Sequence, residues 1–189
     1  MKRLFVAIKI EPDERFLQIY NHLNGSLKYE SLRFVEIDKI HLTLRFLGET
    51  PETKIIELDK ILSEVADKTN AFSLNINRIG VFGSSYNPRV LWMGIDNDAP
   101  LALLHKNIEK NLSRIGFYSD RQNFVPHLTL TRIKQLKDLK LFQKIIAPYK
   151  EVEVMSQPIT SFTLYESILK PKGPTYISLN RFQLKSRSL

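Results

Sequence analysis

The sequence contains no cysteine, which removes disulfide bonds, thiolate metal sites and cysteine nucleophiles from consideration. A chain without thiols is compatible with a reducing cytoplasm, and we expect it to reside there. Long apolar runs are also missing. The apolar N-terminal stretch, residues 3–10, is interrupted by Lys9 and followed by the segment Glu11-Pro12-Asp13-Glu14. It is too short for a signal peptide or a membrane span, so we interpret it as a first strand and expect no membrane association.

A nucleotide-binding loop of the Gly-x-x-x-x-Gly-Lys type is absent too, so we expect no ATP dependence and no cofactor. What the chain has in excess is positive charge: the net charge is +8 and the pI is about 9.6. Such a balance favours polyanionic partners, RNA or DNA first. A generically basic, solvated surface would explain the charge equally well.

The 189 residues, 43% hydrophobic, are enough for one domain or for two lobes that share one core, without covalent staples. Apolar periodicity predicts an alternation of strands and helices. The predicted strands cover residues 3–10, 40–47, 72–82, 89–95, 124–133, 152–155, 161–169 and 175–184. The predicted helices cover residues 12–27, 50–67, 98–116 and 136–146.

The tetrapeptide His-Leu-Thr-Leu occurs twice, beginning at His41 and at His127. Each copy has the period-2 alternation of a strand with one buried and one open face. Histidine and threonine therefore point to the same side, and the two leucines point to the other. With four histidines in the chain, random composition would give only about 0.2 His-x-Thr triplets, so the repeat is unlikely to be accidental.

The two motifs lie 86 residues apart, and the same offset relates other segments. It moves the helix at 12–27 onto 98–113, the helix from residue 50 close to that at 136–146, and the strand at 89–95 onto 175–181. This spacing indicates an internal duplication. We therefore predict an α+β fold that is bilobal and pseudo-symmetric. Two antiparallel sheets with outer helices would surround a central cleft, and the two histidines would face each other across it.

Several segments, in the same order along the chain, resemble the two-histidine (2H) phosphoesterase superfamily. Within it they are similar to the RNA 2',3'-cyclic phosphodiesterase family, also named 2'-5' RNA ligase or LigT-like. The segments are Arg3-Leu4-Phe5-Val6-Ala7-Ile8, His41-Leu42-Thr43-Leu44-Arg45-Phe46-Leu47-Gly48, Arg89-Val90-Leu91-Trp92, Pro126-His127-Leu128-Thr129-Leu130-Thr131-Arg132, Leu164-Tyr165-Glu166-Ser167 and Gly173-Pro174-Thr175-Tyr176. The resemblance covers nearly the whole chain and implies a bilobal fold of residues 1–189 with the catalytic cleft between the lobes.

The residue types suit the opening of a cyclic phosphate. Histidine titrates near neutrality, so one imidazole can act as a base while another, protonated, acts as an acid. The resemblance implies that His127 activates water and that His41 protonates the 3'-oxygen, which leaves a 2'-phosphate. The reverse reaction would join a 2',3'-cyclic phosphate end to a 5'-hydroxyl through a 2'-5' bond. The residues themselves do not order the two histidines.

Four further side chains are candidate substrate contacts. Thr43 and Thr129 can donate hydrogen bonds to phosphoryl oxygens, and Arg132 or Arg45 can clamp the phosphate. Strict alternation places Arg45 on the face of His41, and places Arg132 opposite to His127 unless the strand ends or bulges there. The resemblance favours Arg132. No carboxylate stands at a ligand-like spacing beside either motif, so no metal site is predicted.

The leading hypothesis is a monomeric, metal-independent enzyme that acts on RNA with 2',3'-cyclic phosphate ends. One alternative is a non-catalytic RNA- or nucleotide-binding module with the same fold. Another is a phosphodiesterase that acts on small cyclic phosphates or on 2'-5' oligonucleotides. His22 and His105 lie in helical patterns and are interpreted as ordinary helix residues. The aromatic residues Phe5, Tyr165 and Tyr176 could stack on a base, but such side chains belong to the core more often.

Overall fold

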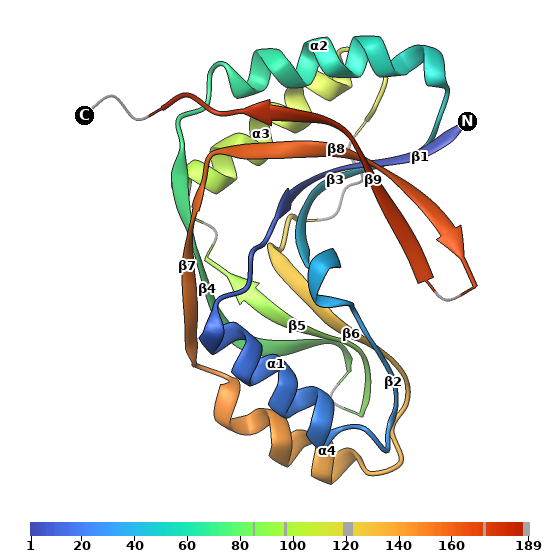
Figure 1. The fold of residues 1–189 in the computed structure, drawn as a ribbon, viewed down its shortest axis with the longest axis vertical. Helices are drawn as coiled ribbons and strands as arrows, with labels where there is room; N and C mark the ends of the chain where they lie inside the picture. Colours follow the sequence, from blue (N-terminus) through green and yellow to red (C-terminus); the bar gives the residue numbers. More distant parts are fainter. Residues whose placement is uncertain (85, 97, 119–122, 172, 187–189) are drawn as a thin grey trace.

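In a computed structural model that describes residues 1–84, 86–96, 98–118, 123–171 and 173–186, the strands form one curled antiparallel sheet (Figure 1). Its order is β7-β4-β5-β6-β3-β1-β8-β9, and β2 pairs with β6. The strands are β1 (Lys2–Lys9), β2 (Ser31–Phe34), β3 (His41–Thr50), β4 (Phe72–Ser84), β5 (Asn87–Ile95), β6 (His127–Gln135), β7 (Glu153–Ile159), β8 (Ser161–Lys170) and β9 (Gly173–Gln183).

Four α-helices of the described residues cover the two ends of the sheet as two pairs (Figure 1). They are α1 (Glu14–Ser26), α2 (Ile55–Ala66), α3 (Ala99–Ser113) and α4 (Leu139–Ile146), with short 3-10 turns η1 (Ile37–Lys39), η2 (Glu52–Lys54) and η3 (Ala147–Tyr149). Helices α2 and α3 pack on each other and on β9 and β3, whereas α1 contacts α4 and β7. The helices α1 and α3 are thus exchanged between the lobes. Helix α1 follows β1 in the chain but packs near β7, and α3 follows β5 but packs near β3.

The helices form where the apolar pattern predicts them. In α1 the buried side chains are Phe16, Ile19, Tyr20 and Leu23, spaced at helical intervals. The side chain of Asp13 accepts a hydrogen bond from the backbone N–H of Phe16 at 2.8 Å, which satisfies one of the free amides of the first turn. No helix among the described residues combines the length and the apolarity needed to span a bilayer.

The sheet is continuous between the two lobes through one pair of strands, β3 and β6, which are paired at Leu42 and Leu128. These equivalent leucines of the two motifs lie 86 residues apart, so a pseudo-twofold axis passes between them. On either side of it β1 lies beside β3 as β5 lies beside β6, and β8 follows β1 as β4 follows β5. The predicted α+β class is confirmed, with the two expected sheets joined as halves of one. The 89–95 strand, however, begins the second repeat and is the spatial equivalent of β1 rather than of the final strand.

Both leucines of each motif lie in the core. Leu42, Leu44, Leu128 and Leu130 are all buried, at 3% exposure or less. The histidines and threonines between them are half-buried on the opposite face. The alternation predicted from the sequence is therefore present in both motifs, and it fixes the face on which a site can form.

Candidate active site

The two motif histidines are held in the same way. The Nδ1 atom of His41 lies 2.8 Å from the carbonyl oxygen of Lys39, and the Nδ1 atom of His127 lies 2.8 Å from that of Val125. A carbonyl oxygen can only accept, so each Nδ1 carries a proton and donates it. In the neutral ring Nε2 then holds the free lone pair. Both imidazoles are thus set up to exchange a proton through Nε2.

The pairing of β3 with β6 brings the two motifs together. Leu42 and Leu128 are paired between antiparallel strands. His41 therefore lies on the side of Thr129, and His127 lies on the side of Thr43. All four polar side chains lie on the face opposite to the leucines. A positive charge on His127 lowers the pKa of His41, as expected for imidazoles that share one site.

Burial is the largest influence on His41. It lowers the pKa of His41 below the ordinary value of 6.5, because the protonated ring loses its hydration. The hydrogen bond to the Lys39 carbonyl opposes this effect, and the charge of His127 adds to it. His41 is therefore biased toward its neutral form.

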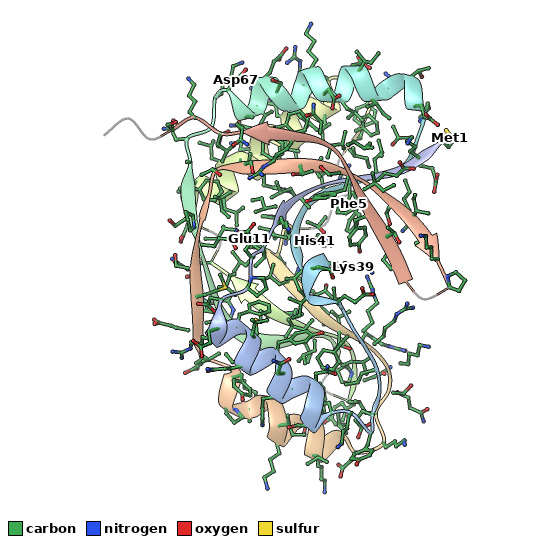
Figure 2. The ribbon with its side chains drawn as sticks, viewed as in Figure 1. Met1, Phe5, Glu11, Lys39, His41 and Asp67 are labelled. Carbon is green, nitrogen blue, oxygen red and sulfur yellow. The ribbon has the colours of Figure 1, made fainter. Side chains whose placement is uncertain are left out.

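Aromatic rings surround His41. The centroids of the Phe5 and Tyr176 rings each lie 5.2 Å from that of His41, with Tyr176 edge-on. Tyr165 stacks on the far side of Phe5 at 5.2 Å. Figure 2 shows Phe5, His41 and Lys39 close together between the two lobes. Phe5 is 2% exposed, so it belongs to the core, as the sequence favoured, and also packs against the imidazole.

The surroundings of His127 are different, and sequence reasoning missed most of them. The ring of Phe82 meets His127 edge-on at a centroid distance of 4.7 Å, and Trp92 packs on Phe82 at 5.3 Å. Trp92 was included in the family resemblance without a role. Phe82 had no motif to mark it, since it reaches His127 only through the alignment of β4, β5 and β6.

Two matching β-bulges decide where the candidate arginines lie. One residue on each motif strand, Leu44 on β3 and Leu130 on β6, has no partner on the neighbouring strand. An extra residue reverses the alternation of side chains beyond it. The pairs that flank the bulges are Thr43–Ala7 and Arg45–Val6 on β3, and Thr129–Trp92 and Thr131–Leu91 on β6.

The face predicted for Arg45 is therefore wrong. Beyond the bulge, Arg45 leaves the His41 face. Its Nε lies 3.3 Å from a carboxylate oxygen of Glu109 on α3, and its Nη2 donates to the carbonyl oxygen of Tyr118. Strict alternation fails here because the bulge at Leu44 inserts one residue between Thr43 and Arg45.

Arg132 is affected in the opposite sense. The bulge buries Leu130 and Thr131 in succession and returns the exposed Arg132 to the face of His127. Its charge reaches Tyr176 across the cleft. Burial raises the pKa of the Tyr176 hydroxyl, and the positive charges of Arg132, Lys39 and Arg3 oppose that rise. Three cations thus converge on the hydroxyl of a residue that packs on His41.

A cavity of about 550 Å³ opens beside His41, on the side of β8 and β9. Hydroxyl, amide and charged groups share its walls with the aromatic rings. Its lining includes Phe5, Lys9, Lys39, His41, Gln157, Ser161, Thr163, Tyr165, Tyr176, Ser178 and Arg181. Within the part of the chain that the structure describes, no three His, Asp or Glu side chains converge as metal ligands. Two carboxylates, Glu11 and Asp38, also line the cavity, so the described site combines imidazoles, hydroxyls, cations and carboxylates.

A family model described as the 2'-5' RNA ligase superfamily matches residues 35–168, well over half of the chain, and spans both motifs. The chain belongs to this superfamily. Curated relatives match most of the length of the chain. A protein of Archaeoglobus fulgidus named RNA 2',3'-cyclic phosphodiesterase is 32% identical over 96% of this chain and 99% of its own. One of Thermotoga maritima with the same name is 36% identical over 80% of this chain and 79% of its own.

Solved structures of other proteins share the fold. Escherichia coli LigT, crystallised with 3'-AMP, is 26% identical, covers 97% of this chain and 98% of its own, and superposes with a TM-score of 0.74. A Thermus thermophilus protein reaches a TM-score of 0.82 at 23% identity, over 98% of this chain and 100% of its own, and shows the fold alone. Together the relatives confirm the predicted family and enzyme class.

Proposed function

We propose that this protein hydrolyses the 2',3'-cyclic phosphate at the end of an RNA strand to a 2'-phosphomonoester. One observation carries the proposal: two imidazoles, each anchored through Nδ1 to the carbonyl two residues before it, present Nε2 on one face. The names of the relatives supply the substrate class. Both half-sites come from one chain, so a monomer is sufficient.

The reaction needs one proton removed and one delivered. His127 accepts a proton from water through Nε2, and the oxygen of that water attacks phosphorus. The bond from phosphorus to the 3'-oxygen breaks, and His41 gives its Nε2 proton to that oxygen. The phosphate stays on the 2'-oxygen, and the two histidines have exchanged their protonation states.

The hydroxyls of Thr43 and Thr129 would donate hydrogen bonds to the non-bridging oxygens as negative charge builds on them. Arg132 would add a charged contact from the His127 side, since the bulge turns it to that face. Arg45 is better explained as a structural residue. Its guanidinium is engaged by Glu109 and by the carbonyl of Tyr118 on the other face.

The assignment of His41 as the acid requires its protonated form. Burial lowers the pKa of His41, which opposes that role. A bound phosphodiester is an anion, and an anion nearby favours the imidazolium. Substrate binding is therefore expected to take up a proton at His41. Without that proton uptake, the lowered pKa of His41 would favour the reverse order, with His41 as the base and His127 as the acid.

The same groups would catalyse 2'-5' joining, in which a 5'-hydroxyl takes the place of water as the nucleophile, the bond to the 3'-oxygen breaks and a 2'-5' bond forms. Small cyclic phosphates are the competing substrate class, and the crystal of LigT with 3'-AMP shows that a relative accepts a mononucleotide. The net charge of +8 favours a longer RNA, whose backbone phosphates gain from cations outside the site.

The test is an oligonucleotide that ends in a 2',3'-cyclic phosphate, incubated with the protein in EDTA. We expect the end to become sensitive to phosphomonoesterase, and His41→Ala and His127→Ala to abolish the change. His22→Ala is the matched control, because His22 contacts Tyr149 and Ser26 rather than the cleft. A wild type that binds RNA but leaves the cyclic end intact would identify a non-catalytic binding module. Loss of turnover in EDTA would refute the metal-free mechanism.

A further inference from the structure

An arginine occupies an unusual backbone position on the lobe of His127. In β4, Asn77 pairs with Gly94 and Ile79 with Met93, so Arg78 is an extra, bulged residue. Its φ is +33°, the one positive value among the described non-glycine residues. Bulges of this kind usually place glycine at the left-handed position, because a side chain there is strained. Retaining an arginine at such a position points to a use for its side chain.

The side chain of Arg78 lies over Gly94. A Cβ atom built on Gly94 would meet Cγ of Arg78 at 2.9 Å, Nε at 3.0 Å and Cζ at 3.2 Å. Gly94 is paired with His127, and residues directly opposite each other in an antiparallel pair project to the same face. The absence of a side chain at Gly94 therefore lets Arg78 lie across β5, on the face to which His127 projects from β6.

Neighbouring groups hold this guanidinium without covering it. Nη1 donates to the side-chain oxygen of Asn77 at 2.8 Å and lies 3.5 Å from a carboxylate oxygen of Asp96. Asn77 also donates to Asp96 at 2.5 Å, so the three side chains form one cluster. The Arg78 side chain remains 46% exposed, which leaves donors of its planar fork open to an anion.

The position of Arg78 separates it from the reacting phosphate. The two motifs meet between β3 and β6, whereas Arg78 comes from β4, beyond β5 on the His127 side. In the proposed mechanism the nucleophile approaches at His127, opposite to the 3'-oxygen that leaves at His41. A group that reaches Arg78 is therefore attached to the nucleophile. Phe82 and Trp92 lie along the same two strands and offer ring surfaces for a base.

We propose that Arg78 is the phosphate contact of an acceptor-strand subsite, which binds an RNA with a free 5'-hydroxyl for 2'-5' joining. This inference rests on the proposed function. The 5'-hydroxyl gives its proton to His127, and its oxygen bonds to phosphorus. The bond to the 3'-oxygen breaks, and that oxygen takes the proton of His41. Arg78 holds the first backbone phosphate of the acceptor and so favours the hydroxyl over water.

The test measures how one cyclic-phosphate strand partitions between hydrolysis and joining at a fixed concentration of a 5'-hydroxyl oligonucleotide. Both products come from the same folded molecules, so their ratio does not depend on how much of a variant folds. We expect Arg78→Ala to lower the ratio of joined to hydrolysed product about tenfold and to leave the hydrolysis rate without acceptor within twofold. Arg78→Lys should fall between, since it keeps the charge and loses the fork.

Arg114→Ala is the matched control. It removes the same charge from the end of α3, where Arg114 contacts Glu64 and Asn111, and should leave the ratio unchanged. An unchanged ratio in Arg78→Ala would overturn the acceptor subsite, as would a wild type that hydrolyses but never joins. An equal fall of both reactions would overturn it too and would assign Arg78 to the cyclic-phosphate strand. A wild type that does not hydrolyse the cyclic end refutes the proposed function itself.

Discussion

The two half-sites share a backbone arrangement and differ in almost everything around it. Each histidine is anchored through Nδ1 to the carbonyl two residues earlier, and each motif strand bulges at its second leucine. Around His41 lie Phe5 and Tyr176, and Lys9 is its partner across the strands. Around His127 lie Phe82 and, over Gly94, Arg78.

This difference shows how a duplicated motif can divide labour. The anchoring fixes where each Nε2 points, so it is the shared requirement of an acid and of a base. The surroundings differ, and at His41 burial favours the neutral ring. Matched substitutions in the two half-sites that lower activity equally would therefore indicate the shared part of the site. Substitutions that lower activity unequally would indicate the divergent part.

The largest expected effect is the loss of either histidine. His41→Ala and His127→Ala should each lower kcat for cyclic phosphate hydrolysis by about 10²- to 10⁴-fold, because each removes one proton transfer. Single-turnover kinetics on a cyclic-phosphate oligonucleotide would measure it.

Since the two imidazoles act as a unit, the double variant should be little slower than either single one. A single variant that retains half of the wild-type rate would remove that residue from the acid–base pair. Losses that multiply in the double variant would show that the two rings act independently.

The threonines test whether the symmetry extends to the phosphate. Thr43→Val and Thr129→Val keep the shape of the side chain and remove one hydroxyl donor each. We expect kcat to fall about 10- to 100-fold in both, below the effect of a full oxyanion-hole donor. Circular dichroism would confirm that the variants fold. If only one of the two slows the reaction, the phosphate is held from one lobe, and the symmetric picture of the charge-stabilising groups is wrong.

The arginines beyond the two bulges should behave oppositely. Arg132→Ala should lower kcat/KM about tenfold and leave the melting temperature nearly unchanged, because Arg132 is exposed on the His127 face. Arg45→Ala should lower stability by about 1–3 kcal/mol, since it leaves the largely buried Glu109 carboxylate without its cation. Denaturant unfolding and initial rates per folded molecule would separate the two. The reverse pattern would place Arg45, and not Arg132, on substrate.

These arginines also mark the limit of prediction from the sequence. Period-2 alternation placed the histidines, threonines and leucines of both motifs on their observed faces, since local sequence determines it. A bulge depends on how two strands pair, and no residue of the motif reveals it. The alternation argument therefore failed one residue beyond each second leucine. For Arg132, the possibility of a bulge was the one condition under which the family pattern and the geometry could agree.

The remaining omissions have the same origin. The 86-residue offset predicted the pseudo-symmetry, because a duplication leaves the same spacing between equivalent segments of the sequence. It did not show that α1 and α3 are exchanged between the lobes. Phe82 and Arg78 escaped notice because both lie on β4, two strands away from the motif strand β6, and their place near His127 depends on how these strands pair. The short strand β2, which pairs with β6, was also missed. Its residues Ser31-Leu32-Arg33-Phe34 do alternate polar and apolar side chains, but four residues are the shortest run in which this pattern indicates a strand.

The smallest expected effect concerns the pH dependence of stability and tests the enclosure of His41. Burial lowers the pKa of folded His41 below 6.5, so the unfolded chain binds a proton before the folded one does. Stability is then fully present above about pH 6.5 and falls as the pH drops from that value to the lowered pKa. His41→Gln should lose less melting temperature between pH 7.5 and pH 5 than the wild type does.

His105 must be included in this measurement, because burial lowers its pKa as well, against the raising effect of Glu109. His105→Gln should therefore also flatten the profile, and the double variant should flatten it further. If the melting temperature of the His41→Gln variant falls as steeply between pH 7.5 and pH 5 as that of the wild type, burial does not lower the pKa of His41, and the aromatic enclosure of His41 does not set the order of acid and base.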